Sequence, residues 1–374
     1  MRIGILTLPL HTNYGGILQA YALQTILERM GHEVVILDKG QHCHLSIWKM
    51  PLSYSKRILR KYVLGEKNVR IFYEHWYNRT YPIVSQHTQR FINAFIHAKL
   101  VSNLNDLNEK DFDAIVVGSD QIWRVHYYPQ IENGFLAFTK DWKHMKRIAY
   151  APSFGTDEWE YSKKQTQICR QLAQNFDAIS VREISGVKLC REHLGVEAKH
   201  VLDPTMLLDK EDYLYLISKA KVVRHSNMLL QYVLDENEEK SAIIQCVAQA
   251  KHLETIRINS KVENETASLN KRIQPPVEQW LAGFYDADFV ATDSFHACVF
   301  AIIFNKPFIV IGNKKRGYAR FQSLLSIFEL SNRLVTCKAE VLAIMHEPID
   351  WEVVNKKRYD LQKQSIDYLQ SNLK

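Results

Sequence analysis

The chain has 374 residues, of which 46% are hydrophobic and 24% charged, and these proportions exclude a disordered or fibrous protein. Its formal net charge of +7 suits an anionic substrate or a loose contact with a membrane surface, but the charge is too diffuse to indicate nucleic-acid binding. The sequence has no apolar stretch of membrane-spanning length, no signal-peptide pattern at the start and no CxxC pair among its six cysteines. We therefore expect a cytoplasmic protein with reduced thiols.

The first predicted unit is a strand, a loop, a helix and a second strand. The apolar residues 2–8 predict a buried strand, helical spacing of apolar residues follows Gly16, and residues 34–37 predict the next strand. A β–α–β unit of this length places its two strands in parallel.

The loop of this unit reads HTNYGGILQAYALQ from residue 11. The pair Gly15 and Gly16 sits where the strand turns into the helix, and glycine there lets a ligand approach the backbone. The free N–H groups of a helix start favour phosphate or carboxylate. The pattern is not the GxGxxG of dinucleotide-binding proteins, and a turn that merely needs glycine is the alternative interpretation.

Further strands and helices alternate along the rest of the chain, after an irregular, aromatic and basic insertion at 40–108. The strands are expected at 114–117, 147–150, 178–181, 200–202, 229–234, 255–258, 289–291 and 308–311, and the helices at 161–175, 185–194, 237–251, 277–286, after TDSFHA, and at about 354–372.

This alternation predicts an α/β protein with two Rossmann-like, doubly wound domains that face a cleft. We expect an N-terminal domain at 1–215, a C-terminal domain at 216–350, and a final helix within 351–374 that packs back on the first domain.

Most of the unusual polar residues follow predicted strands. Ligands of open α/β sheets bind beyond the carboxyl ends of the strands, so these residues should meet in one cleft. The candidates for contact with substrate are Asn13, Tyr14, Gly15, Gly16, Ser119, Gln121, Ser153, Ser294, Lys314, Lys315 and Arg316, and those for catalysis are His296, Asp120 and Arg182.

Each catalytic candidate has a structural alternative. His296 can donate to a phosphate or act as an acid near neutral pH, or it can simply lie at a helix start. Arg182 can hold an anion in a bidentate manner or form an internal salt bridge, and Asp120 can act as a base or cap a turn. Together these residues favour a site for an anion and a polyol.

Several motifs, taken in order, resemble the polysaccharide pyruvyl transferase family. They are HTNYGGILQAYALQ, GSDQIW, APSFG, SVRE, LDPTMLL, ADFVATDSFHACVFAIIFNKPFIVIG and the RF at 320–321. The resemblance runs from residue 2 to about 325.

The resemblance implies a fold similar to B-type glycosyltransferases and transfer of pyruvate from phosphoenolpyruvate onto two hydroxyls of one sugar. A cyclic ketal forms, phosphate is released, and neither a metal nor an organic cofactor is expected. His296 matches the histidine of the family's SFHA-like motif, and Arg182 matches its strand-ending arginine.

Two other functions stay open at this point: a nucleotide-sugar glycosyltransferase of the same architecture, and a non-catalytic carbohydrate-binding or assembly protein. A lipid-linked acceptor and a peripheral membrane contact through region 47–81 are further hypotheses. The acceptor sugar and the oligomeric state are not indicated by the sequence.

Overall fold

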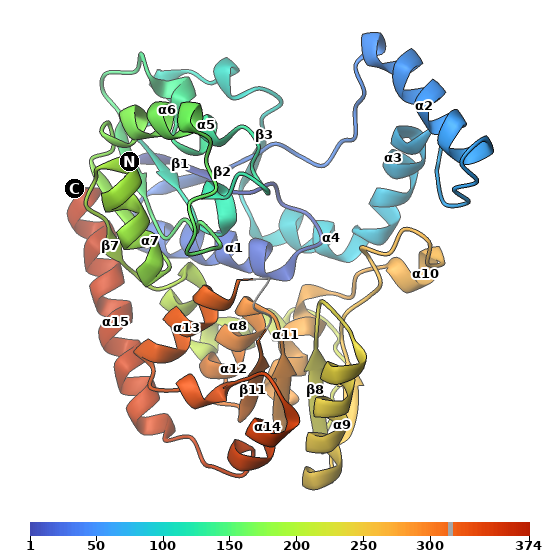
Figure 1. The fold of residues 1–374 in the computed structure, drawn as a ribbon. Coiled ribbons are helices and arrows are strands. Elements are labelled where there is room, and N and C mark those ends of the chain that lie inside the picture. Colours follow the sequence, from blue (N-terminus) through green and yellow to red (C-terminus); the bar gives the residue numbers. More distant parts are fainter. Residues whose placement is uncertain (313–316) are drawn as a thin grey trace.

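The computed structural model describes residues 1–312 and 317–374, which form two α/β domains (Figure 1). In the described chain, seven parallel strands make the first sheet, in the order β3-β2-β1-β4-β5-β6-β7, and five make the second, in the order β12-β11-β10-β8-β9. The strands are β1 (Arg2–Leu6), β2 (Glu33–Asp38), β3 (Ala98–Leu100), β4 (Ala114–Val117), β5 (Lys146–Ala149), β6 (Ala178–Val181), β7 (Lys199–His200), β8 (Met228–Tyr232), β9 (Glu254–Arg257), β10 (Phe289–Thr292), β11 (Phe308–Ile311) and β12 (Leu334–Val335).

Both sheets are covered on both faces, as doubly wound sheets require. In β4, Val116 packs into one hydrophobic cluster, whereas Ile115 and Val117 pack into another on the opposite face. Successive residues of β10 likewise pack on opposite faces of the second sheet, with Val290 in one hydrophobic cluster and Phe289 in another. Strands buried on both faces read as continuous apolar runs, which makes them recognisable from the sequence. The predicted fold class, two Rossmann-like α/β domains, is confirmed.

The helices occupy the connections between the strands. They are α1 (Tyr14–Arg29), α2 (Met50–Tyr62), α3 (Tyr73–Val84), α4 (Gln86–Phe95), α5 (Ile131–Gly134), α6 (Lys163–Ala173), α7 (Ile184–Leu189), α8 (Lys210–Ser218), α9 (Glu238–Lys251), α10 (Leu269–Arg272), α11 (Val277–Asp286), α12 (Phe295–Ile303), α13 (Tyr318–Ile327), α14 (Lys338–Ile344) and α15 (Trp351–Asn372). The sequence does not predict β3, β12, α8, α13 or α14. The two strands are too short to show a period, and α8 lies in a polar stretch interpreted as a domain boundary.

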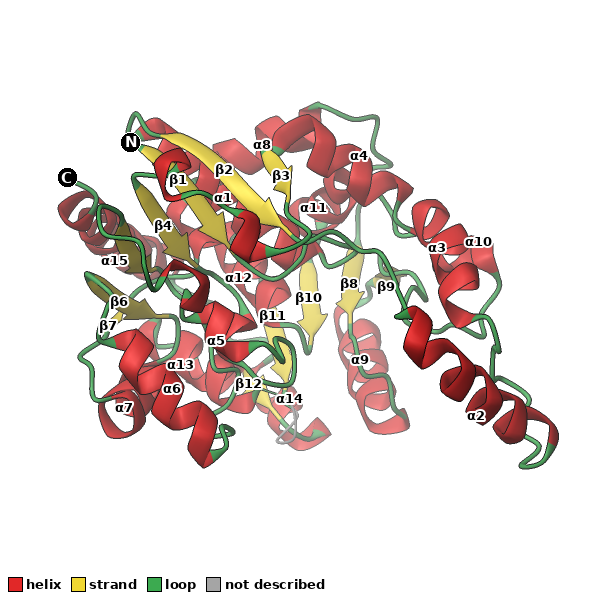
Figure 2. Ribbon diagram, turned by 90° about the horizontal axis from the view of Figure 1, so that it is seen from above, coloured by secondary structure: helices red, strands yellow, loops and turns green. Residues whose placement is uncertain are grey.

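The insertion at 40–108 contains α2, α3, α4 and β3. Its last helix, α4, packs on α1 and α11, and β3 becomes the edge of the first sheet. Its first helix, α2, stands away from both domains in two perpendicular views (Figures 1 and 2).

The two domains share one continuous apolar core. The largest cluster of buried residues runs from β1 and α1 of the first domain to α11 and α12 of the second. At its edge, the Tyr14 ring stacks on Trp280 at 5.2 Å between centroids, and the Tyr14 hydroxyl donates to Pro275 O at 2.8 Å. The Gln274 side-chain amide also donates to Thr12 O, at 2.9 Å. The start of α1 is thereby fixed against the second domain.

The C-terminal helix α15 runs along both domains and returns to the first, so that the two ends of the chain lie near each other (Figure 1). The Tyr368 hydroxyl donates to Ala149 O, Leu202 N donates to the Ser365 hydroxyl, and the Gln362 amide donates to Leu207 O. No helix in residues 1–312 or 317–374 is both long and apolar enough to cross a membrane.

A buried glutamine connects the loop after β1 to the loop after β4. Gln19 of α1 donates to the Thr7 hydroxyl at 2.9 Å and accepts from Ser119 N, also at 2.9 Å. Gln19 and Ser119 are fully buried. The amide therefore sets the position of the loop after β4 relative to α1.

We expect Gln19→Leu to lower the free energy of unfolding by about 1–3 kcal/mol, because it leaves the buried Ser119 N–H without a partner. Urea denaturation measures this, with Gln370→Leu on the exposed side of α15 as the matched control. Equal stability of the two variants would show that the buried amide is dispensable.

Candidate active site

A cavity of about 580 Å³ lies between the two domains. In both sheets the strand order reverses direction at one point, between β1 and β4 in the first and between β8 and β10 in the second. Ligands of open α/β sheets bind at such switch points, beyond the carboxyl ends of the strands. The loops after these four strands all contribute to the cavity wall, which includes His11, Asn13, Gly15, Asp120, Gln121, Tyr127, Tyr232, Glu236, Asn259, Ser260, Lys261, Glu263, Asn264, Asp293, Ser294, Phe295, His296 and Arg320.

The start of α1 forms the floor of this cavity and touches the second domain. Asn13 caps the helix, since its side chain accepts from Gly16 N at 3.3 Å. Gly15 lies directly against the His296 ring: a Cβ at position 15 would be 2.1 Å from Nδ1. A Cβ at position 16 would meet nothing nearer than 3.7 Å. The two adjacent glycines therefore differ, because only Gly15 is required by close packing.

His296 enters the cavity from the first turn of α12, directly beyond the end of β10. The Thr292 hydroxyl donates to Tyr232 O at 2.6 Å and accepts from Ser294 N at 3.0 Å, which fixes the turn into the helix. The Ser294 side chain makes no cap hydrogen bond, although it occupies the N-cap position. The Nε2 atom of His296 is buried and has no hydrogen-bond partner in the described part of the chain.

A buried arginine joins three loops of the first domain. The Arg182 side chain is only 1% exposed, and its guanidinium lies 2.8 Å from Asp203, 3.2 Å from Glu183 and 3.5 Å from Asp120. The internal salt bridge considered for Arg182 is therefore present. The geometry favours a positioning role, because the guanidinium is already engaged by carboxylates; contact with a donor anion stays a prediction.

Asp203 connects this arginine to the histidine. Its Oδ2 atom lies 3.6 Å from His296 Nε2, and its Oδ1 accepts from the Thr205 hydroxyl at 2.6 Å. Burial raises the pKa of Asp203, but the adjacent His296 and the charge of Arg182 outweigh it and hold the pKa well below its ordinary value. The carboxyl is therefore ionised at neutral pH and orients the imidazole.

Asp120 combines exposure to the cavity with an unusual backbone. Its φ is 63° and its ψ is −171°, a backbone conformation that costs about 1–3 kcal/mol for any residue other than glycine. Ser153 N donates to Asp120 O at 2.8 Å and helps to hold this conformation. The strained turn directs a carboxylate into the cavity while Arg182 contacts it from behind.

Arg320 of α13 is a second arginine of the site, and its surroundings differ from those of Arg182. Its Nε is buried without a hydrogen-bond partner, and none of the ion pairs between described residues includes it. Desolvation by burial and the nearby charge of Arg182 lower its pKa to about 10, so the guanidinium is charged at neutral pH. The Phe295 ring contacts both guanidiniums, at 4.4 Å from Arg182 Cζ and 5.8 Å from Arg320 Cζ. Arg320 is therefore suited to bind an anion in the cavity.

The structure places the other predicted substrate contacts in two groups. Gln121 lies in the cavity wall with Asn13, Gly15 and Ser294. The residues outside that wall are buried in supporting loops or form the turn: Tyr14, Gly16, Ser119 and Ser153. The predictions for Lys314, Lys315 and Arg316 lie outside the described residues.

Several cavity residues are not among the site residues predicted from the sequence. Arg320 lies in the cavity wall, and Asp203 is buried outside it. Both belong to family-like motifs, the RF at 320–321 and LDPTMLL, and these motifs are the sequence signal that could have found them. His11 stands in the first loop, and burial lowers its pKa. The wall formed by residues 259–264 could not be recognised, because it belongs to a polar loop without a motif.

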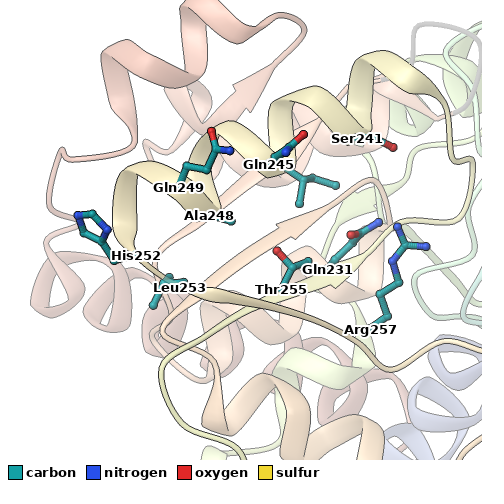
Figure 3. A pocket seen from close by; sticks show the side chains of 10 residues that line it. Gln231, Ser241, Gln245, Ala248, Gln249, His252, Leu253, Thr255 and Arg257 are labelled. Atoms are coloured by element: carbon teal, nitrogen blue, oxygen red, sulfur yellow. The ribbon is translucent and has the colours of Figure 1, made fainter.

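A second hollow, of about 610 Å³, lies on the outer side of the C-terminal domain along α9 and β9 (Figure 3). Its lining includes the amides of Gln231, Gln245 and Gln249, with His252 at one end and Arg257 at the other. The Arg257 guanidinium is paired with Glu236 at 2.7 Å. This hollow does not bring together the charged groups that the interdomain cavity contains.

The glycine pair offers a direct test of the packing at the cavity floor. We expect Gly15→Ala to lower the free energy of unfolding by about 1–3 kcal/mol, because the new methyl group overlaps the His296 ring. We expect Gly16→Ala to leave stability unchanged or slightly raised. Urea denaturation of both variants measures this, and equal losses would contradict the assigned contact.

Substitution by methionine should change the free energy of unfolding in opposite directions at Arg182 and Arg320. Arg182→Met leaves buried carboxylates unpaired and should lower the free energy of unfolding by about 3–5 kcal/mol. Arg320→Met removes a half-buried charge that has no ion-pair partner among the described residues, and it should raise the free energy of unfolding by about 1 kcal/mol in the ligand-free protein. Urea denaturation of both variants measures the difference, and destabilisation by both would show that Arg320 is also structural.

Solved structures of similar architecture have low sequence identity to this chain. Arabidopsis thaliana UGT89C1 complexed with UDP-L-rhamnose is 10% identical, with 98% of this chain and 97% of that chain covered and a TM-score of 0.49. The glycotransferase of kitacinnamycin is 10% identical, with 99% and 98% covered and a TM-score of 0.49. A glycosyltransferase from Rickettsia africae is 8% identical, with 98% and 93% covered and a TM-score of 0.46.

A comparison with curated proteins finds no match. The sequence model of the polysaccharide pyruvyl transferase family, in contrast, matches residues 13–315, which is most of the chain. This range includes the glycine pair, the ion network around Arg182 and the start of α12. The chain therefore belongs to the polysaccharide pyruvyl transferase family.

Proposed function

We propose that this protein transfers the pyruvyl group of phosphoenolpyruvate to two hydroxyls of one sugar, in a surface polysaccharide or its precursor. Within the family, the observation that carries this proposal is the uneven charge of the cavity. Arg320 places a positive charge at one end beside His296, whereas the wall contributed by the second domain carries Glu236 and Glu263, and its Asp293 is paired with Lys240. A dianionic donor and a neutral sugar would occupy different ends of such a cavity.

The cationic end suits the donor. Phosphoenolpyruvate carries a carboxylate and a phosphate on adjacent atoms, and a guanidinium can bind either group through two parallel hydrogen bonds. Arg320 has a buried Nε without a partner, and His296 has an unpartnered Nε2, among the described residues. Both side chains contact the Phe295 ring, so they approach one region of the cavity from neighbouring helices.

The other wall suits a polyol. Carboxylates accept hydrogen bonds from hydroxyl groups, and amides both accept and donate them, without requiring charge on the ligand, whereas the carboxylates repel a second anion. Asn259, Asn264 and Gln121 add such groups to the wall. A lipid-linked precursor could present its sugar in the same way, and it would bring the enzyme to a membrane surface.

The proposed chemistry balances without a further reactant. One sugar hydroxyl attacks the carbon that carries the phosphate, the methylene group gains a proton and becomes a methyl group, and a second hydroxyl displaces phosphate to close the ketal. Of the two hydroxyl protons, one ends on the methyl carbon and the other leaves with phosphate. The donor carries its own leaving group, so the proposal invokes no organic cofactor.

We assign His296 as the acid or the phosphate contact, and Asp120 as the base for the acceptor hydroxyl. Arg182 is the positioning residue that holds Asp120 and, through Asp203, the His296 ring. Arg320 supplies electrostatic stabilisation as negative charge accumulates on the departing phosphate.

Phosphoenolpyruvate should raise the melting temperature of the wild-type protein, because a ligand that binds only the folded state stabilises it. Arg320→Gln should weaken binding by about 10- to 100-fold, the value of a lost charged hydrogen bond.

In phosphate-release assays with a panel of methyl glycosides, His296→Gln should lower kcat/KM by about 10²- to 10⁴-fold.

The matched control for histidine is His346→Gln, which changes an exposed side chain just after α14. It should leave both binding and turnover unchanged. A thermal shift with a nucleotide sugar and none with phosphoenolpyruvate would instead favour a glycosyltransferase. Glycan binding that is insensitive to His296→Gln, without turnover, would favour a non-catalytic carbohydrate-binding protein.

A further inference from the structure

The feature that the proposed function leaves unused is the projecting start of the insertion, residues 47–64, which we call the arm. It consists of a short 3-10 turn, Ile47–Lys49, followed by α2. In both perpendicular views the arm extends beyond the two domains and meets the rest of the protein through α3 (Figures 1 and 2).

Only one side of the arm is packed. The Tyr54 ring meets Phe72 edge-on at 5.3 Å between centroids. The Arg57 guanidinium pairs with Glu74 at 2.7 Å and donates to Ile71 O at 2.9 Å. These contacts fix the rotation of α2, so that its opposite face is directed away from the protein.

That opposite face carries large apolar side chains. Trp48 is 92% exposed, Leu52 77%, Leu59 51% and Val63 70%. Leu52 and Leu59 lie in α2, Trp48 lies in the preceding 3-10 turn, and Val63 is the C-cap residue of α2. Their spacing of four, seven and four residues is that of side chains along one side of a helix. Isolated exposed apolar residues are common, but a continuous stripe of this kind on one helix marks an interaction surface.

The arm is also strongly basic. Residues 47–64 contain five lysines and arginines and no acidic residue, and two of the five, Arg57 and Arg60, pair with Glu74 and Glu66 outside the arm. Lys49 and Arg60 each directly follow a stripe residue, and Lys56 lies about two helical turns after Lys49 and about one before Arg60, so the three follow one border of the stripe. A second copy of the chain would bring this positive face against itself, so the charge disfavours self-association and favours an anionic partner.

We propose that the arm is an interfacial anchor that binds the surface of an anionic lipid bilayer. Amphipathic helices with Trp and Leu on one face and Lys and Arg beside it lie in the plane of the headgroups. The apolar stripe enters the boundary with the acyl chains, and the lysines contact the lipid phosphates. This proposal stands on the arm alone and does not depend on the identity of the donor substrate.

The arm is connected to the sugar-binding wall of the cavity. Tyr73 at the start of α3 donates to Glu265 Oε1 at 2.7 Å, and Arg70 donates to Glu265 O at 2.9 Å. The Arg272 guanidinium in turn donates to Val262 O, in the loop that forms the cavity wall. The arm is therefore linked, through the start of α3, to a loop of the cavity wall.

The test is flotation of the full-length protein with vesicles of phosphatidylcholine alone or with about 30% phosphatidylglycerol. The wild-type protein should float with the anionic vesicles, and a variant with Trp48→Ser, Leu52→Ser, Leu59→Ser and Val63→Ser should bind them at least about tenfold more weakly. The matched control carries Leu342→Ser, Val353→Ser and Tyr359→Ser, which change exposed apolar residues on α14 and α15. It should float like the wild type.

Charge is tested separately. Lys49→Glu with Lys56→Glu should weaken vesicle binding by about tenfold or more, and added salt should weaken wild-type binding in the same direction. Lys356→Glu with Lys363→Glu on α15 is the charge-matched control and should have little effect. Blue-shifted tryptophan emission on vesicle addition, lost in Trp48→Phe, would place that side chain in the bilayer.

The proposal is overturned if the wild type does not float, if it floats equally well with neutral vesicles, or if the serine variant floats undiminished. It is also overturned if the wild type forms a dimer that the serine substitutions dissociate, because the stripe would then be a subunit interface. Circular dichroism verifies that each variant is folded. Turnover with a soluble glycoside should be unchanged in the arm variants, which distinguishes failure of the anchor from failure of the proposed reaction.

Discussion

The guanidinium of Arg182 holds together loops that the two sheets would otherwise leave independent. Its three carboxylate neighbours follow three different strands, β4, β6 and β7. Through Asp203 the same network reaches His296 of the second domain. Buried ion pairs contribute little net stability compared with apolar residues of similar volume. The arrangement is therefore better explained by positioning: Asp120 and His296 face the same cavity because one buried cation fixes both.

Arg320, a half-buried cation, shows the opposite use of an arginine. The protein leaves its Nε without a partner among the described residues, beside Phe295, and burial lowers its pKa to about 10. The unpaired Nε destabilises the free protein, and an anion bound there would remove this cost. Part of the binding free energy of the ligand would therefore come from pairing this group. Two arginines thus contact one aromatic ring, one of them engaged by carboxylates and the other proposed to bind an anion.

The sequence predicted the elements that are buried on both faces much better than the site they support. The strands at 114–117 and 308–311 and the helix at 277–286 have the predicted bounds, because each is a continuous or periodic apolar segment. His296, Asp120 and Gly15 were predicted as site residues because they follow such strands, and all three lie in the cavity wall. The engagement of Arg182 by three carboxylates and the unpaired Nε of Arg320 depend on loops far apart in the chain, and no local pattern reports them.

The insertion at 40–108 shows a second limit of prediction from the sequence. Its aromatic and basic composition is visible in the sequence, but composition alone does not tell a packed helix from an exposed one. The contact of Tyr54 with Phe72 and the pairing of Arg57 with Glu74 determine which face of α2 is packed. They cover one face of the helix and leave the stripe from Trp48 to Val63 exposed. A surface that is both apolar and basic is costly to expose to water and repels its own copy, so an anionic bilayer satisfies both properties at once.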